Sequence, residues 1–160
     1  MKRWMILAAA ALALAACKGG AVPGSSTAGE APAVHPESGL PVAPLTIERG
    51  GKTYHFRVEL AQTTQQQAQG LMFRTKLGPA EGMLFPLDPP RPASFWMRNT
   101  VIGLDLLFIA ADGRIANIAA NAKPYDETPL KSAGPVKAVL ELPGGRAAEL
   151  GIVAGVRVRW

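Results

Sequence analysis

Two carboxylates of this sequence lie within strongly apolar stretches. Asp105 occurs in GLDLLFI and Glu141 in VLELPGG. A carboxylate among apolar side chains is costly unless it is paired or hydrogen-bonded. We therefore expect Asp105 to be a buried anchor, tied to a loop or to Arg74 or Arg98. In the alternative interpretation, Asp105 and Glu141 act as the acid and base of a cell-envelope glycan hydrolase.

The stretch FWMRNT, residues 95–100, combines side chains typical of a core with side chains typical of a binding site. In an extended strand, Trp96 and Arg98 would share one face and Asn99 would lie on the other. In one interpretation the aromatic and methionine side chains fill the core, while Asn99 hydrogen-bonds an irregular loop. In the other, Trp96 offers a stacking surface and Arg98 holds an anionic or hydroxyl-rich ligand at a pocket rim. The candidate ligand-binding residues are Arg74, Trp96, Arg98, Asn99 and Asp105.

Three methionines lie beyond the N-terminal segment, namely Met72, Met83 and Met97. Thioethers are soft ligands that suit Cu(I), so periplasmic copper binding is a further alternative. Each of the three has a Leu, Phe or Trp beside it, which favours core packing instead. We therefore predict no metal site and no cofactor.

Common catalytic signatures are missing from the sequence. It has no GxSxG elbow, no HExxH zinc helix, no CxxC pair and no phosphate-cradling glycine loop. These absences argue against the common hydrolases, proteases and nucleotide-binding enzymes. The formal net charge of +5 is spread along the chain, which supports at most a mild affinity for anionic lipid or glycan. The favoured function is a non-catalytic binding or accessory module.

Residues 1–16 have the layout of an export signal, because Lys2 and Arg3 precede an apolar run too short to span a bilayer. The run ends in LAAC, which resembles a bacterial lipobox and implies diacylglyceryl attachment to Cys17. Cys17 is the single cysteine, so the folded part has no thiol chemistry. We expect a lipid-anchored, periplasm-facing protein of the cell envelope with no nucleic-acid partner. Lys18, in place of Asp, favours the outer membrane over the inner membrane.

The rest of the chain divides by composition. Residues 17–44 contain Cys17 and a stretch rich in Gly, Ala, Ser and Pro, which is typical of a flexible tether. Residues 45–160 have the length of one domain and enough apolar residues to form a core without disulfides.

Apolar residues of this domain alternate at period two more often than at the helical period. Hairpins are predicted at Gly50-Gly51 and at Asp112-Gly113, and GMLFPL, SFWMRN, PVKAVLEL and GVRVRW are expected to form four more strands. We predict a mainly β domain, a sandwich or barrel-like arrangement of about eight short strands. One helix is expected at TTQQQAQG, where Thr63 or Thr64 begins a capping box, and a second at GGRAAELG.

The motifs also resemble a known family. GLMFR at 70–74, GMLF at 82–85, FWMRNT at 95–100, GLDLLFI at 103–109 and VLELPGG at 139–145 occur in the order found in the Domain of Unknown Function 192 family. The resemblance covers essentially the whole domain and implies a compact, mostly β fold without an established activity. Gly103 stands where the family usually has proline, and Val156 where an aspartate often follows glycine.

Overall fold

The computed structural model describes residues 33–160. Their first two strands form a hairpin whose turn consists of two glycines. β1 (Val42–Arg49) and β2 (Lys52–Leu60) pair antiparallel, with Arg49 opposite Lys52. Gly50 and Gly51, between them, have φ angles of 58° and 74°. A two-residue turn with both φ angles positive suits the twist of a hairpin, and glycine adopts it without strain. The first predicted hairpin is therefore confirmed.

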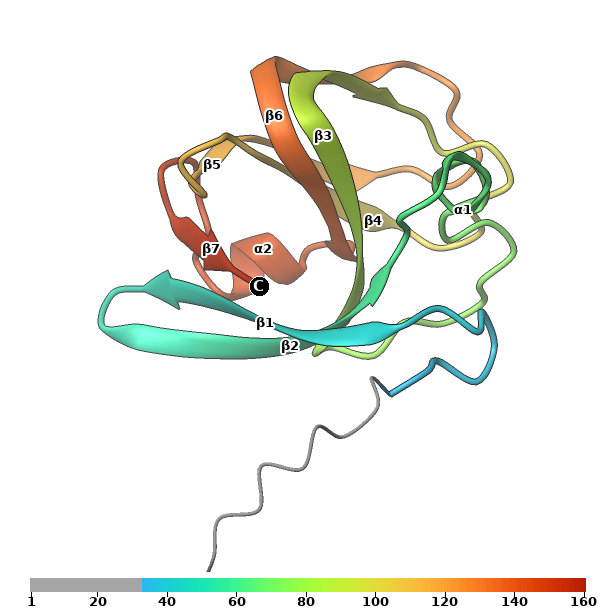
Figure 1. Cartoon of the computed structure of the whole chain (residues 1–160), viewed down its shortest axis with the longest axis horizontal. Coiled ribbons are helices and arrows are strands. Elements are labelled where there is room, and N and C mark those ends of the chain that lie inside the picture. The colour runs from blue at the N-terminus through green and yellow to red at the C-terminus, as the bar shows by residue number, and fades with distance from the viewer. Residues whose placement is uncertain (1–32) are drawn as a thin grey trace, which may run out of the picture. The chain divides into compact units, whose positions relative to one another are not determined.

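Seven strands form one sheet with the order β5-β4-β6-β3-β2-β1-β7 (Figure 1). The remaining strands are β3 (Glu81–Phe95), β4 (Leu104–Ile109), β5 (Ile115–Ala122), β6 (Leu130–Pro143) and β7 (Arg157–Arg159). Neighbouring strands are antiparallel except β2 and β3, which are parallel. A parallel pair needs a crossover, and residues 61–80 supply it.

The sheet curls until its two ends meet. The amide of Ile115 donates to the carbonyl of Val156 at 2.9 Å, and that of Val158 donates to Gly113 at 2.8 Å. These bonds join Gly113 and the first residue of β5 to β7 and the residue before it, and the curled sheet is barrel-like. The predicted mainly β, barrel-like domain is confirmed. It has seven strands because GMLFPL and the start of SFWMRN belong to the single strand β3.

Both faces of the curled sheet are covered. One face carries the α2-side core, which includes Ile47, Val58, Leu107 and Leu140. The other carries the loop-side core, which includes Met83, Phe85, Leu106 and Phe108. All six residues of β4 are buried, because alternate side chains enter the two cores.

Two short helices lie at the predicted positions. α1 (Thr64–Gln69) begins at Thr63, whose side chain accepts from the amide of Gln66 in a capping box, and ends at Gly70. α2 (Arg146–Glu149) follows β6 and lies beside β7 within the curl (Figure 1). Across residues 33–160, no helix has the length and apolar character needed to cross a membrane.

The folded part begins earlier than predicted. Residues 33–41, here called the arm, run into β1, with Val34 bridged to Pro41 and the amide of Leu60 donating to Pro41 at 2.9 Å. Leu40 is buried in the loop-side core. The prediction of a tether is therefore wrong for residues 33–44, because their partners lie far along the chain and local composition does not reveal them. The signal peptide, Cys17 and the rest of the predicted tether lie outside the described residues.

Candidate functional site

Asp105 is fully buried on β4 and is held by backbone donors only. Its Oδ1 accepts from the amides of Asn121 at 2.8 Å and Gly145 at 3.0 Å, and its Oδ2 accepts from Ala147 at 2.7 Å. Asn121, within β5, and Gly145, at the N-cap of α2, have positive φ angles of 49° and 83°. Asp105 thus ties β4 to the end of β5 and to the first turn of α2. Neither Arg74 nor Arg98 is its partner.

Asp105 and Glu141 are not brought together. In the β4–β6 ladder Asp105 lies opposite Leu142, and Glu141 lies opposite Leu106. Asp105 bonds Ala147 of the α2-side core, whereas Glu141 alternates with two residues of that core and so faces the other way. The sheet itself separates the two carboxylates, so the structure does not assemble the acid and base pair considered above.

Glu141 is buried among apolar neighbours on the loop side of the sheet. It is 5% exposed, and its partners in the strand ladders, Met83 and Leu106, are fully buried. Desolvation raises the pKa of Glu141 to about 8. The carboxyl group is therefore protonated at neutral pH.

Arg74 is the centre of an ion-pair cluster that sequence reasoning did not find. Its Nη1 and Nη2 donate to the two carboxylate oxygens of Glu59, at 3.0 and 3.1 Å, and its Nε lies 2.7 Å from Oε2 of Glu37. His35 places Nε2 3.7 Å from Glu59. The buried strand position of Glu59 was the available signal, because such a carboxylate needs a cation and Arg74 follows in GLMFR.

The stretch FWMRNT is a loop beyond Phe95, not an extended strand. β3 ends at Phe95, whose ring packs edge-to-face against Phe85 and Phe108 at centroid distances of 5.1 and 6.4 Å. Met97 is buried in the same core. The predicted alternation of faces fails here because the amide of Met97 leaves the sheet and donates to the carbonyl of Asp126 at 2.8 Å.

Trp96 and Arg98 point away from that core and contact each other. The guanidinium carbon of Arg98 lies 4.5 Å from the centre of the Trp96 ring, and Nη2 lies 2.6 Å from Oε2 of Glu127. The hydrogen bond to Glu127 raises the pKa of Arg98, and the same bond lowers the pKa of Glu127. Stacking and ion pairing together hold an exposed indole in one orientation.

Three loops meet around Asn99 and form what we call the aromatic loop cluster, residues 71–74, 96–100 and 123–128. The amide of Phe73 donates to Asn99 at 2.9 Å, and that of Tyr125 donates to Thr100 at 3.2 Å. Phe73, Asn99 and Tyr125 have φ angles of 63°, 55° and 61°. Left-handed backbone is unfavourable for aromatic residues and is concentrated at functional sites.

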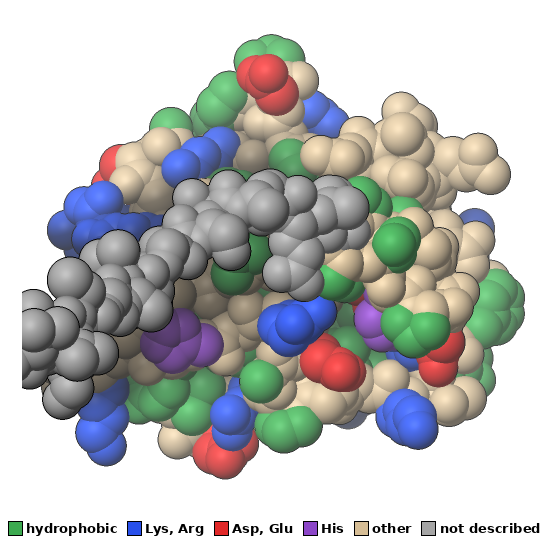
Figure 2. Space-filling view, turned by 60° about the horizontal axis from the view of Figure 1, so that its bottom comes forward, with side chains coloured by type: hydrophobic (Ala, Val, Ile, Leu, Met, Phe, Trp, Pro, Cys, Tyr) green, Lys and Arg blue, Asp and Glu red, His purple; other side chains and the backbone are tan. Residues whose placement is uncertain are grey.

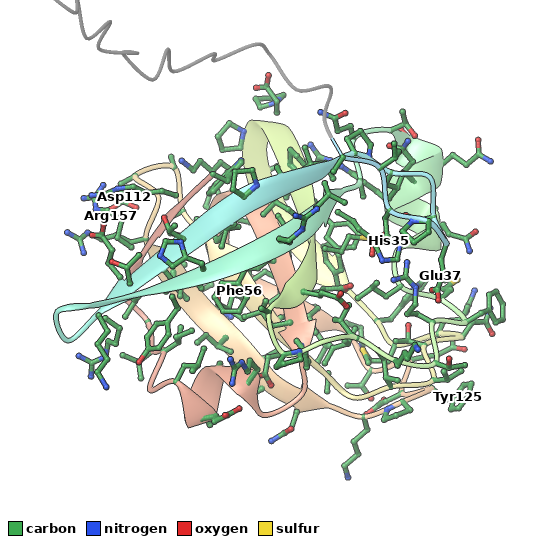
Figure 3. The ribbon with its side chains drawn as sticks, turned by 90° about the horizontal axis from the view of Figure 1, so that it is seen from below. His35, Glu37, Phe56, Asp112, Tyr125 and Arg157 are labelled. Atoms are coloured by element: carbon green, nitrogen blue, oxygen red, sulfur yellow. The ribbon has the colours of Figure 1, made fainter. Side chains whose placement is uncertain are left out.

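Three of the four exposed large aromatic side chains in residues 33–160 belong to this cluster, and the fourth is Trp160. Phe73 is 64% exposed, Trp96 50% and Tyr125 62%. Tyr125 projects from the edge of the molecule on the side that also bears His35 and Glu37 (Figure 3). Large exposed rings held by strained loops are typical of binding surfaces.

Two grooves flank the C-terminal end of α1. The arm groove, about 610 Å³, lies between the arm and α1 and is lined by residues that include Glu37, Ser38, Thr63, Gln65, Phe73 and Arg74. The Trp96 groove, about 470 Å³, is lined by residues that include Thr64, Gln67, Phe95, Trp96 and Arg98. Gln69, Gly70 and Met72 line both grooves.

The predicted ligand-binding residues are thus divided among four places. Trp96 and Arg98 line the Trp96 groove, and Arg74 lines the arm groove. Asn99 lies between the loops, where its Nδ2 is 3.9 Å from Sδ of Met72. Asp105 lines neither groove. Of the three methionines, Met83 and Met97 are buried in the loop-side core, and only Met72 reaches the grooves.

Comparison with known proteins adds a family and two solved structures. The model of the DUF192 family, described as an uncharacterized ACR, matches residues 45–160. A crystal structure of a protein of unknown function from Novosphingobium aromaticivorans is 58% identical, covers 82% of this chain and 94% of its own, and superposes with a TM-score of 0.79. A crystal structure of a Sinorhizobium meliloti protein, described as a candidate transcription regulator, is 40% identical and superposes with a TM-score of 0.73. The match covers 75% of this chain and 94% of that protein's chain. No curated protein matches the chain.

Replacing Asp105 by Asn tests its role as a structural anchor. We expect Asp105→Asn to lower the free energy of unfolding by about 3 kcal/mol, because charge-assisted bonds to three buried amides are weakened. Urea unfolding of the two proteins measures this. Asp112→Asn, at an exposed turn, is the control and should change the free energy of unfolding by less than about 1 kcal/mol. Equal stability of Asp105→Asn and wild type would show that Asp105 is not an anchor.

The raised pKa of Glu141 predicts an unusual dependence of stability on pH. Between the unfolded pKa, about 4.3, and the folded pKa, about 8, the folded protein keeps a proton that the unfolded chain releases. The free energy of unfolding should therefore fall as pH rises over that interval, by up to about 1.4 kcal/mol per pH unit from this group. Glu141→Gln should remove this contribution, and the exposed Glu149→Gln should retain it. Urea unfolding from pH 5 to pH 8 with identical slopes for all three proteins would contradict the assignment.

Proposed function

This chain belongs to the DUF192 family, and we propose that it is a lipid-anchored, non-catalytic module of the cell envelope that binds a neutral, hydroxyl-rich ligand such as a glycan. The observation that carries the proposal is the Trp96 groove. It joins a half-exposed indole, held by Arg98, to the hydroxyl of Thr64 and the amide of Gln69. Aromatic rings pack on the apolar C–H face of a sugar, while hydroxyl and amide groups meet its hydroxyls.

A neutral ligand fits better than an anionic one, because two of the three arginines that line the grooves, Arg74 and Arg98, are already paired. The third, Arg91, lines the Trp96 groove and makes no ion pair among residues 33–160. Arg98 is bound by Glu127, and Arg74 is bound by both Glu59 and Glu37. At Arg74 or Arg98, an incoming anion would have to displace a carboxylate. On the face that Figure 2 presents, Lys and Arg side chains are dispersed among acidic and apolar ones, which also gives no concentrated positive field.

A binding role fits better than hydrolysis. Both carboxylate oxygens of Asp105 accept hydrogen bonds from backbone amides, three in all, and Glu141 lines neither groove. A general acid or base must reach a substrate within hydrogen-bonding distance. Copper binding has less support still, because a soft-metal site needs several clustered ligands and two of the three methionines are buried in the core.

The lipid anchor rests on the sequence alone. The charged start, the short apolar run and LAAC before Lys18 support diacylglyceryl attachment at Cys17 and, with Lys18, location at the outer membrane. An anchor of several acyl chains would hold the module stably at a membrane surface.

Metabolic labelling with an alkyne fatty acid in a Gram-negative host tests the anchor. The wild-type chain should incorporate the label and Cys17→Ala should not, because Cys17 supplies the only thiol for acylation. Ser25→Ala is the matched control and should be labelled like wild type. An unlabelled wild-type chain, or a labelled Cys17→Ala, would refute the lipid anchor.

Substitution of Trp96 tests ligand binding. We use residues 31–160, which form a compact unit, and N-acetylglucosamine oligomers as the neutral probe, measured by calorimetry. Trp96→Ala should weaken binding at least about tenfold, the equivalent of 1.4 kcal/mol, because the stacking surface is lost. Trp160→Ala is the control, since Trp160 is also exposed and also contacts a cation, Lys137. An uronic-acid oligomer should bind more weakly than the neutral one. The proposal fails if no neutral oligomer binds or if the two tryptophan variants behave alike.

A further inference from the structure

The arm groove, like the Trp96 groove, combines polar side chains with an exposed aromatic ring. Ser38 and Thr63 contribute hydroxyl groups, and Gln65 and Gln69 contribute amides. Phe73, 64% exposed, offers the apolar ring that Trp96 offers in the other groove. Both grooves have volumes within the range of small-molecule sites, about 300 to 1,000 Å³.

The charges within the arm groove balance internally. Arg74 faces two carboxylates, with Glu59 buried beneath it and Glu37 more than half exposed at its outer edge. One guanidinium between two carboxylates leaves no surplus positive charge for an anion. The groove therefore suits a neutral ligand with many hydroxyl groups, which can donate to the outer carboxylate and accept from exposed amides.

The two grooves adjoin at the end of α1. Gln69, Gly70 and Met72 belong to both linings. Gly70 ends α1 with a φ of 50°, and a Cβ at this position would lie 3.4 Å from the ring of Phe85. Met72 is held to one side by Asn99, whose Nδ2 is 3.9 Å from Sδ. Phe73 follows Met72 directly, so the two aromatic platforms lie on either side of this shared segment.

We propose that the arm groove is a second subsite for the ligand of the Trp96 groove, so that the ligand is a linear glycan long enough to occupy both. This inference rests on the proposed function. It assigns Phe73 and Gln65 to the arm subsite, Trp96 to the first subsite, and Gln69 to the junction. A chain of several sugar units then binds more tightly than a short one, because its second half engages the arm subsite without a further loss of translational freedom.

The arm is part of this site although it lies outside the family match of residues 45–160. The amide of His35 donates to Leu40 at 2.9 Å and the amide of Val42 donates to Ala33 at 2.6 Å, which closes the arm into a loop. The arm is fastened to the domain by the pair of Glu37 with Arg74, and Figure 3 shows His35 and Glu37 on this loop. The arm thus forms one wall of the second subsite.

The test compares a hexamer and a dimer of N-acetylglucosamine on residues 31–160 by calorimetry. Wild type should bind the hexamer at least about tenfold more tightly than the dimer. Phe73→Ala and Gln65→Trp should each reduce the hexamer affinity toward that of the dimer and leave the dimer affinity unchanged. The first removes the ring and the second fills the groove from an exposed helix position. Val153→Ala, an exposed apolar position that lines neither groove, is the control.

The outcomes separate this inference from the function on which it rests. If wild type binds both oligomers equally, or if both arm-subsite variants keep the full hexamer affinity while Trp96→Ala abolishes binding, the second subsite is refuted and the proposed function stands. If wild type binds neither oligomer, the second subsite and the proposed function are both refuted. Urea unfolding of each variant confirms that a loss of binding is not a loss of fold.

Discussion

The buried carboxylate of Asp105 holds together three segments that would otherwise have no common partner. Its oxygens accept from Asn121 near the end of β5, and from Gly145 and Ala147 at the start of α2. Because β4 is buried on both faces, water could not replace these bonds, and loss of any one would leave a buried polar group unpaired. The position of α2 against its core, and with it the closing of the curl near β7, depends on this contact.

Asp105 fixes α2 on one face of the sheet, and the loops that line the two grooves lie on the other face. The loop-side core supports the aromatic loop cluster, with Met97 buried in it and Phe95 packed against it, while Trp96 and Arg98 are exposed. Arg74 and Glu59 fasten the crossover and the arm to the same side. A rigid sheet that carries strained loops with exposed rings is a physically economical way to present a binding surface.

Much of the fold could be predicted from local chemistry. The pair Gly50 and Gly51 indicated one hairpin, and Asp112 with Gly113 indicated another. Thr63 with Gln66 indicated the start of α1. Each of these signals acts over a few residues, so the sequence displays it directly. The site was harder to predict from the sequence. Trp96 and Arg98 were identified as candidate ligand-binding residues, but Glu37, Gln65, Phe73 and Glu127 were not. Their roles depend on loops that meet only in the folded chain.

The sequence by itself determined the mainly β architecture, the positions of the turns and helices, the family, and the need for Asp105 to find partners, since these follow from periodicity, turn residues and the cost of burying charge. Only the tertiary structure decided which partners those were. Strand register placed Asp105 and Glu141 on opposite faces of the sheet, and long-range hydrogen bonds turned FWMRNT out of the strand. The physical reason is that a side chain's neighbours across a sheet are set by register and by loop closure, which link residues far apart in sequence.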